Sequence, residues 1–240
     1  MSKFKFSILG VSLFLLGSSS LNNICSAKDV KVEKLCAEKS LDNVEQKKIK
    51  EIELVFIIDM SGSMSGQEDK VLKGFKDMLE EQKTCDDGRN VNLTTVVFNT
   101  QVKTLHNGAD IKGISGLTES DYQPNGCTAL LDAVGNTVKS INDSGKDKYV
   151  ICVVITDGYE NSSYRFSQQQ IKGLIKEKES QGNWKFLYYM SGIELNEKTN
   201  IGIRKDDCMR CASALEDANI GEKIMKNASL RMADTRARLR

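Results

Sequence analysis

The segment "IELVFIIDMSGSMSG", residues 52–66, decides the fold. It begins with a nearly continuous apolar run of strand length, which is typical of a β-strand covered on both faces. The run ends at Asp59, and Ser61 and Ser63 follow at alternate positions. A turn needs some small polar residues, but it does not need an acid and two hydroxyls at this spacing. Because alternate residues of an extended chain face the same side, the three side chains can direct oxygen atoms to one point.

The rest of the chain alternates apolar strands with amphipathic helices. Strand 101–106 follows its predecessor after a short turn and is expected to pair with it as a hairpin. The alternation predicts a Rossmann-like α/β fold with a mostly parallel central sheet, one antiparallel edge strand, and helices on both faces. We expect strands at 52–59, 90–100, 101–106, 149–157 and 184–192, and helices at 67–83, 127–143, 167–182 and 221–240.

The N-terminus has the order of a secretory signal peptide. Two lysines precede an apolar run at 6–17, and small and polar residues follow. We expect residues 1–27 to be the signal peptide, with cleavage after Ala27. The apolar run is too short for an ordinary transmembrane helix, so an uncleaved interfacial anchor or a lipid on Cys25 are the alternatives. The leader predicts a secreted, cell-envelope or periplasmic protein that touches a membrane only if the leader stays uncleaved.

The length and the charge of the chain indicate its domain organisation and limit the class of partner. Residues 28–50 are mostly charged and are predicted to be a linker, with a peripheral helix as the alternative. This leaves 51–240, including the C-terminal helix, as the folded domain. The formal net charge of +1 argues against nucleic acid as a partner, because nucleic-acid-binding proteins usually carry a basic excess. The tail 231–240 contains four arginines. We expect a solvated helix end there, with a phosphate or membrane-surface patch as the alternative.

Three polar loops are expected at one edge of the sheet. Asp157 ends strand 149–157, and Thr128 opens the helix at 127–143. In open α/β sheets, ligands bind where the carboxyl ends of the strands gather. Carboxylates and hydroxyls are hard oxygen ligands that suit Mg²⁺ or Mn²⁺, with Ca²⁺ as an alternative. If some residues act through water, a coordination position stays open to a carboxylate of a partner. The predicted metal-binding residues are Asp59, Ser61, Ser63, Thr128 and Asp157.

The strings "DMSGS" (59–63), "GCTALLDA" (126–133) and "TDG" (156–158) together resemble the metal-ion-dependent adhesion site of the von Willebrand factor type A domain. The resemblance covers roughly residues 51–193 and extends to the C-terminal helix. It implies that the two serines and the threonine contact the metal, and that the aspartates bind it directly or through water. The strings are most similar to small bacterial or phage single-domain members. Those members are generally not predicted to be exported, so the leader is a departure.

The residues after Asp157 are candidates for the rim of the site. Tyr159, Glu160 and Asn161 are expected to line the rim and shape specificity, as is Tyr164. The alternative is a solvated loop. The serines and Thr128 also have an alternative role as turn formers and helix caps, but capping does not require an aspartate at two strand ends.

Enzyme classes fit the sequence less well. A phosphatase with Asp59 as nucleophile needs a second aspartate two residues on, and Ser61 stands there. "GSMSG" lacks the spacing of a nucleophile elbow, and His106 lies in a predicted strand. "SGKDK" has Asp147 where a phosphate-binding loop needs Ser or Thr. We therefore expect no enzymatic activity and a structural role for His106.

Six cysteines follow the predicted cleavage site. Cys127 and Cys152 are expected to be small buried thiols. The other four allow two disulfides in any of three pairings. The "CMRC" pair is alternatively half of a zinc site, which the scarcity of histidine and the missing second pair disfavour. The four are Cys36, Cys85, Cys208 and Cys211.

The sequence therefore predicts an exported, divalent-cation-dependent protein-binding domain of adhesion type, whose metal coordinates an Asp or Glu of the partner. The first alternative is a non-catalytic subunit that couples to an ATPase or another envelope complex. The second is a phosphatase-type hydrolase that uses Asp59.

Overall fold

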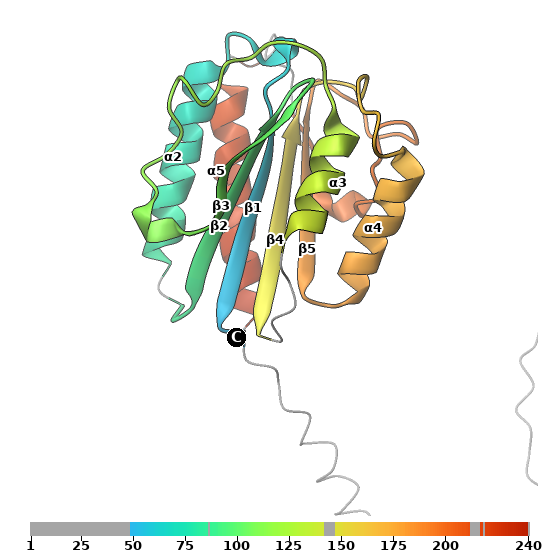
Figure 1. The fold of residues 1–240 in the computed structure, drawn as a ribbon. Helices are drawn as coiled ribbons and strands as arrows, with labels where there is room; N and C mark the ends of the chain where they lie inside the picture. The colour runs from blue at the N-terminus through green and yellow to red at the C-terminus, as the bar shows by residue number, and fades with distance from the viewer. Residues whose placement is uncertain (1–48, 86, 142–146, 212–216, 218, 240) are drawn as a thin grey trace, which may run out of the picture. The chain divides into compact units, whose positions relative to one another are not determined.

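The computed structural model describes residues 49–239, except 86, 142–146, 212–216 and 218 (Figure 1). The predicted signal peptide, most of the linker, and Cys25 and Cys36 lie outside the described residues. The described chain forms a six-stranded sheet in the order β3-β2-β1-β4-β5-β6. All neighbouring strands are parallel except β2 and β3, which pair antiparallel at one edge. The predicted α/β fold is confirmed.

The strands lie close to their predicted bounds. β3 is longer than expected because its pairing with β2 continues down to Asp110. The strands are β1 (Glu51–Asp59), β2 (Asn90–Phe98), β3 (Val102–Asp110), β4 (Lys148–Thr156), β5 (Trp184–Ser191) and β6 (Cys208–Cys211).

Helices cover both faces of the sheet (Figure 1). One face packs against α2 and α5, and the other against α3 and α4. Ser167 and Gln170 form a capping box that begins α4 where the sequence predicted it. The helices are α2 (Glu68–Thr84), α3 (Leu130–Ser140), α4 (Gln168–Ser180) and α5 (Ile220–Arg238).

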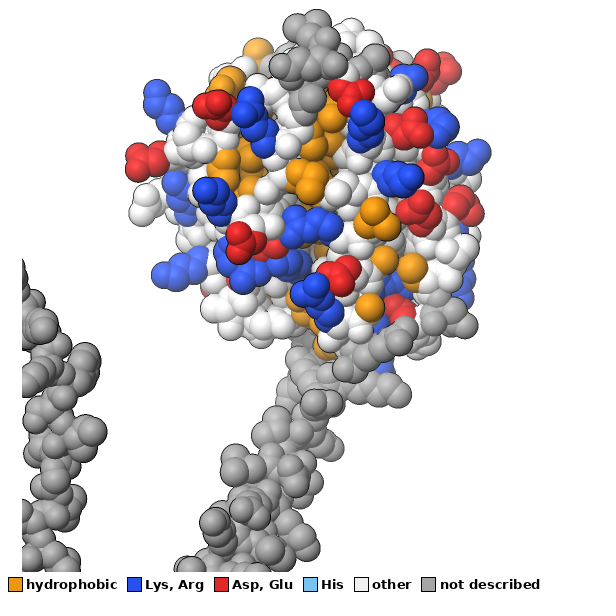
Figure 2. Space-filling model, turned by 180° about the vertical axis from the view of Figure 1, so that it is seen from behind, with side chains coloured by type: hydrophobic (Ala, Val, Ile, Leu, Met, Phe, Trp, Pro, Cys, Tyr) orange, Lys and Arg blue, Asp and Glu red, His pale blue; other side chains and the backbone are white. Residues whose placement is uncertain are grey.

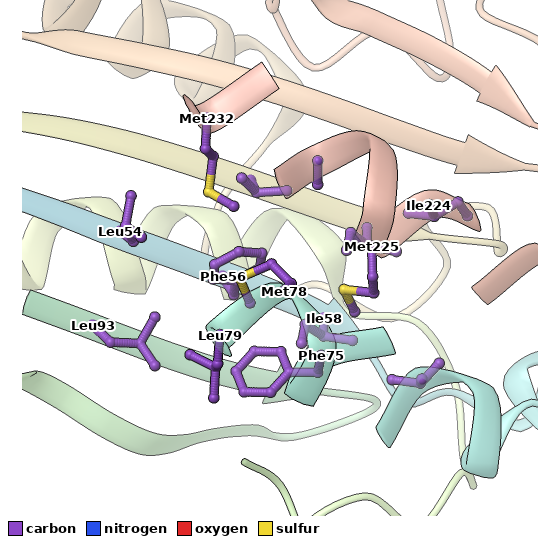
Figure 3. Close-up of a cluster of buried hydrophobic side chains, with 14 of the residues drawn as sticks. Leu54, Phe56, Ile58, Phe75, Met78, Leu79, Leu93, Ile224, Met225 and Met232 are labelled. Atoms are coloured by element: carbon purple, nitrogen blue, oxygen red, sulfur yellow. The ribbon is translucent and has the colours of Figure 1, made fainter. Parts of the chain in front are cut away.

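Strand β1 supplies side chains to both cores. Leu54, Phe56 and Ile58 face α2 and α5, while the alternate residues Val55 and Ile57 face α3 and α4. Figure 3 shows the first cluster, in which the ring of Phe56 meets the ring of Phe75 edge-on at 5.6 Å. A strand buried on both faces explains why the opening segment reads as a continuous apolar run.

The strands that follow β1 in the chain lie on both sides of it. The chain passes from β1 through α2 to β2 on one side, and the later strands β4, β5 and β6 extend on the other side. The crevice between the carboxyl ends of β1 and β4 is therefore the topological switch point, where ligands bind in open α/β sheets. Asp59 ends β1 and Asp157 follows β4, so both predicted acids flank this crevice.

The "CMRC" segment is a strand, which the sequence analysis missed. β6 pairs parallel with β5 at the sheet edge, and four residues are too few to show a period-2 pattern. Cys208 and Cys211 pack on opposite faces of the sheet and do not bond to each other. The five described cysteines are free thiols, and Cys127 is exposed, so the expectation that it is buried is wrong.

Arg236 corrects the expectation of a solvated C-terminal tail. Its side chain is 1% exposed. The guanidinium donates to Asp87 Oδ2 at 2.8 Å, to the backbone and side-chain oxygens of Gln82 at 3.1 and 2.9 Å, and to the carbonyl of Cys85 at 3.0 Å. It anchors the end of α5 to the end of α2. Arg238, by contrast, is exposed and pairs with Asp234.

The surface carries both signs of charge. In Figure 2, Lys and Arg side chains are interspersed with Asp and Glu over the face seen from behind. This mixing agrees with the formal net charge of +1. Within the described residues, no helix has the length and apolar character needed to cross a membrane.

Candidate metal centre

Asp59 lies fully buried at the carboxyl end of β1. Its Oδ1 accepts the backbone N–H of Ser61 at 2.7 Å, and its Oδ2 accepts the hydroxyl of Thr156 at 2.5 Å. Its backbone carbonyl accepts the hydroxyl of the buried Tyr122 at 2.7 Å. The carboxylate is therefore held in one orientation by Thr156 of β4 and by the loop after β1, while Tyr122 holds the backbone of the same residue.

The serine loop turns directly after Asp59. Gly62–Met64 form one turn of 3-10 helix, and Ser61 precedes it without making a side-chain cap. The Ser61 and Ser63 hydroxyl oxygens lie 3.1 Å apart, and Ser63 donates to Asp157 Oδ1 at 2.6 Å. Ser61 is buried, whereas Ser63 is exposed at the surface. The loop therefore carries one buried residue, Ser61, and one that solvent or a partner can reach, Ser63.

Thr128 lies just before α3, and the alternative role as a helix cap does not hold for it. The residue at the N-cap is Ala129. The first free N–H groups of α3 are instead accepted by side chains of the loop after β4. Glu160 accepts from Leu131 N at 2.9 Å, and the Ser163 hydroxyl accepts from Asp132 N at 3.0 Å.

Gly158 shows that the oxygen atoms from separate loops surround one space. A Cβ atom added at Gly158 would lie 2.7 Å from Thr128 Oγ1, 3.5 Å from Ser63 Oγ and 3.6 Å from Asp59 Oδ2. These oxygens come from two segments that are distant in the sequence, 59–63 and Thr128, and Gly158 itself lies in a third. A larger residue at position 158 would fill the space between them, so glycine keeps it open.

The donor set fits a hard divalent cation. Mg²⁺ binds oxygens at 2.0–2.1 Å, so neighbouring ligands in an octahedral shell lie about 3 Å apart. The hydroxyl oxygens of the two serines lie 3.1 Å apart, and the Ser63 and Asp157 oxygens lie 2.6 Å apart. Both distances are close to this ligand–ligand separation. Among the described residues, no three His, Cys, Asp or Glu side chains cluster as a metal site, and the candidate centre combines two acids with hydroxyl groups.

The electrostatics of the site also favour a cation. Burial raises the pKa of Asp59 to about 6, against the hydrogen bonds from Thr156 and Ser61, and the nearby Asp157 raises it further. Burial likewise raises the pKa of Asp157. No described Lys, Arg or His side chain forms an ion pair with either carboxylate, and none is among the main causes of the two pKa shifts. A bound cation would supply the missing charge.

The residues that were expected at the rim of the site differ in exposure and in hydrogen bonding. Tyr159 is 58% exposed beside the site. Glu160 is turned inward and accepts from Ser162 N and from both the N–H and the hydroxyl of Ser163, in addition to its bond to α3. The Asn161 side chain accepts the backbone N–H of Thr128 at 2.8 Å. Glu160 and Asn161 therefore fix the loop and α3, and a role in specificity stays a prediction.

Sequence reasoning missed the groups that support the acids. Thr156 and Gly158 flank Asp157 in the quoted "TDG" string, yet nothing local shows that a hydroxyl bonds Asp59 or that a glycine borders the oxygens. His106 pairs with Thr95 in the β2–β3 ladder, three rungs below the carboxyl end of β2. It lies outside the site.

Comparison with known families agrees with this geometry. The sequence model of the von Willebrand factor type A domain matches residues 53–217, which is more than half of the chain. The chain belongs to the von Willebrand factor type A domain family. No curated protein matches it.

Solved structures share the fold of this type A domain at low identity. Proximal thread matrix protein 1 from the mussel byssus, in a form with a zinc-occupied MIDAS motif, is 15% identical with a TM-score of 0.53. The match covers 75% of this chain and 46% of the mussel protein. The pilus adhesin SpaC from Lactobacillus rhamnosus GG is 15% identical with a TM-score of 0.54, over 79% of this chain and 31% of SpaC.

A third structure is the von Willebrand factor domain of the type V pili tip protein Mfa5 from Porphyromonas gingivalis. It is 9% identical with a TM-score of 0.50, and the match covers 76% of this chain and 96% of that domain. The chain spans less than half of the mussel protein and of SpaC. At these identities the likeness describes the fold of the type A domain alone.

Proposed function

We propose that this type A domain binds a protein partner in a divalent-cation-dependent manner, through an Asp or Glu side chain of the partner. The observation that carries the proposal is the convergence of hydroxyl and carboxylate oxygens at the switch point of the sheet, without a cationic side chain to neutralise them. The proposed metal-binding residues are Asp59, Ser61, Ser63, Thr128 and Asp157.

The proposed cation is Mg²⁺ or Mn²⁺, with Ca²⁺ as an alternative. Hydroxyl and carboxylate ligands favour hard cations, and a small ring of oxygens at octahedral spacing favours Mg²⁺ over the larger Ca²⁺ shell of six to eight ligands. The zinc-occupied MIDAS motif of the mussel protein supports a divalent cation at this motif in general.

The open side of the site gives the partner access. Asp59, Ser61 and Thr128 are at most 3% exposed, whereas Ser63 and Tyr159 reach the surface. A cation held there would offer its outer coordination position to a carboxylate oxygen. An acidic side chain is the natural occupant, because it adds charge to a site that already prefers oxygen.

We also propose that the site binds without turnover and acts outside the cytoplasm. His106 lies lower on the edge strand β3, and Ser61 occupies the place of a phosphatase acid/base. The leader-like N-terminus supports secretion or a place in the cell envelope. The names of the proteins that share the fold, a pilus adhesin and a mussel byssus protein, support an adhesion role.

The test compares wild type with Thr128→Ala, since this change removes one hydroxyl and keeps the helix caps. We expect wild type to bind Mg²⁺ in a calorimetric titration and to retain partners from the native source in Mg²⁺ but not in EDTA. Thr128→Ala should lose both at an unchanged melting temperature. Thr104→Ala, on an exposed position of β3, is the matched control. Partner binding that survives both Thr128→Ala and EDTA would falsify the proposal.

A further inference from the structure

A groove of about 290 Å³ lies beside the proposed metal site. The residues that line it come from the turn between β2 and β3, from α3, and from the loop between β4 and α4. Its lining includes Thr100, Gln101, Asn136, Tyr164 and Arg165.

The groove is built on the same loops as the site. Thr100 Oγ1, in the groove, accepts the backbone N–H of Cys127 at 2.9 Å, next to Thr128. Asp132 follows Thr128 by four residues, and its carboxylate accepts three consecutive N–H groups at the far end of the loop after β4. These are the N–H groups of Tyr164, Arg165 and Phe166, at 3.1, 2.9 and 3.0 Å. The relative positions of site and groove are therefore fixed by hydrogen bonds.

Arg165 provides the positive charge in the lining of the groove. Its Nε donates to the hydroxyl of Tyr164 at 3.2 Å, and its guanidinium lies 5.5 Å from the centre of that ring. Within the described part of the chain, Arg165 forms no ion pair. The nearby carboxylate of Asp132 is 3% exposed and already occupied by three backbone donors. The guanidinium is therefore available to an outside anion.

Polar and aromatic groups extend this donor surface. The side-chain amides of Gln101 and Asn136 line the groove and form no hydrogen bond with another described residue. Tyr164 is 79% exposed and Tyr159, on the same loop, is 58% exposed. Exposed Tyr and Arg side chains are enriched at the centres of protein interfaces. The groove thus presents hydrogen-bond donors and a cation beside flat aromatic surface.

We propose that this groove binds a second acidic side chain of the same partner segment whose first acid is bound at the metal site. The inference rests on the proposed function and deepens it: the partner is an extended acidic peptide segment. α3 begins at Leu130, two residues after Thr128, and Asn136 on the groove follows six positions later, about 9 Å of helical rise. An extended segment advances about 3.3 Å per residue, so the second acid lies roughly two to four residues from the first.

The test selects phage-displayed random peptides on the purified full chain, in Mg²⁺ and in EDTA. We expect Mg²⁺-dependent enrichment of peptides with two acidic residues separated by two to four positions. The best peptide is then synthesised, and its second acid is replaced by the uncharged amide. That replacement should weaken binding roughly two- to fivefold, the range of an exposed ion pair.

Arg165→Glu provides the decisive comparison. This variant should select peptides with one acid and with Lys or Arg at the second position, while its Mg²⁺ affinity stays unchanged. Lys176→Glu, an exposed charge reversal on α4, should select the wild-type pattern. Equal melting temperatures of the three proteins establish that the variants fold.

The outcomes separate the inference from the function on which it rests. If wild type and Arg165→Glu both select peptides with a single acid in Mg²⁺, the second subsite is wrong and the metal-dependent function stands. If enrichment is the same in Mg²⁺ and EDTA, or absent in both, the proposed function and the inference fail together.

Discussion

Two buried carboxylates of this domain stand in opposite electrostatic surroundings. Asp59 is fully buried, and its partners are hydroxyl and amide groups. Asp207 is 3% exposed and forms ion pairs with Lys185, Arg204 and Arg231 at 2.5, 2.9 and 2.9 Å. Both residues lie near the sheet, but only Asp207 has cations of its own chain around it.

The pKa values follow this difference. Burial raises the pKa of Asp59 to about 6, and the hydrogen bonds do not overcome it. Burial would also raise the pKa of Asp207, but the hydrogen bonds and charges of Lys185 and Arg204 outweigh it and lower that pKa. A buried carboxylate that is already neutralised has a structural role, whereas one without a cationic partner is suited to bind a cation from outside.

The largest effect is expected at the structural carboxylate. Asp207→Asn leaves three cations close together without their shared acceptor, so the free energy of unfolding should fall by about 2–4 kcal/mol. The value is below that of a fully buried pair because Arg204 is largely exposed. Urea denaturation measures it, and Asp206→Asn, at the exposed neighbouring position, should change stability by less than about 0.5 kcal/mol. Equal losses in the two variants would contradict the comparison.

At the metal site the same substitution should affect binding and spare stability. Asp59→Asn keeps the shape of the side chain but removes its charge, so Mg²⁺ affinity should fall about a hundredfold, while the melting temperature in EDTA stays equal or rises. Calorimetric titration and thermal melts measure the two effects. Asp207→Asn is the crossed control, since it should lose stability and keep its Mg²⁺ affinity. An Asp59→Asn protein that is strongly destabilised in EDTA would show that the acid is structural.

The smallest effect concerns pH. Below pH 6 a proton occupies Asp59 and competes with the cation, so Mg²⁺ affinity should fall about tenfold between pH 7 and pH 5. The metal-free domain should behave in the opposite way. The folded pKa of Asp59 lies above its unfolded value near 3.8, so this residue adds stability as pH falls from 6 toward 4.

Asp207 has the reverse sign, because its lowered pKa gives stability that is lost in acid. Melting curves of wild type and Asp59→Asn in EDTA isolate the contribution of Asp59 as their difference. Mg²⁺ affinity that stays constant from pH 7 to pH 5 would exclude Asp59 as a group that releases a proton when the cation binds.

Much of the fold could be predicted from local patterns. The strand runs and the helical spacing of apolar residues predicted β1, β2, β4, β5 and the four α-helices of the described residues, with small errors at their ends. β6 was missed because four edge residues carry too little pattern, and the end of β3 because its exposed residues lack an apolar face. Local periodicity is informative only where a face is buried over several residues.

The sequence predicted which residues form the candidate site, but not the hydrogen bonds that position them. The sequence placed Asp59, Asp157 and Thr128 at element ends, because each follows a strand or precedes a helix. It could not show that the Glu160 and Asn161 side chains accept backbone N–H groups of α3 and of Thr128. The acceptors and donors of these bonds lie about 30 residues apart, and no spacing rule connects them.

The sequence by itself determined the alternation of strands and helices and the oxygen-bearing residues at the strand ends. These features are encoded within windows of about ten residues, where propensity and burial act locally. Only the tertiary structure decided which buried charges are neutralised. Arg236 donates to Asp87, which lies 149 positions away in the chain. Asp207 forms ion pairs with three cationic side chains, whereas Asp59 forms none with a described residue. Charge pairing depends on distances between remote segments, and those distances exist only after the chain has folded.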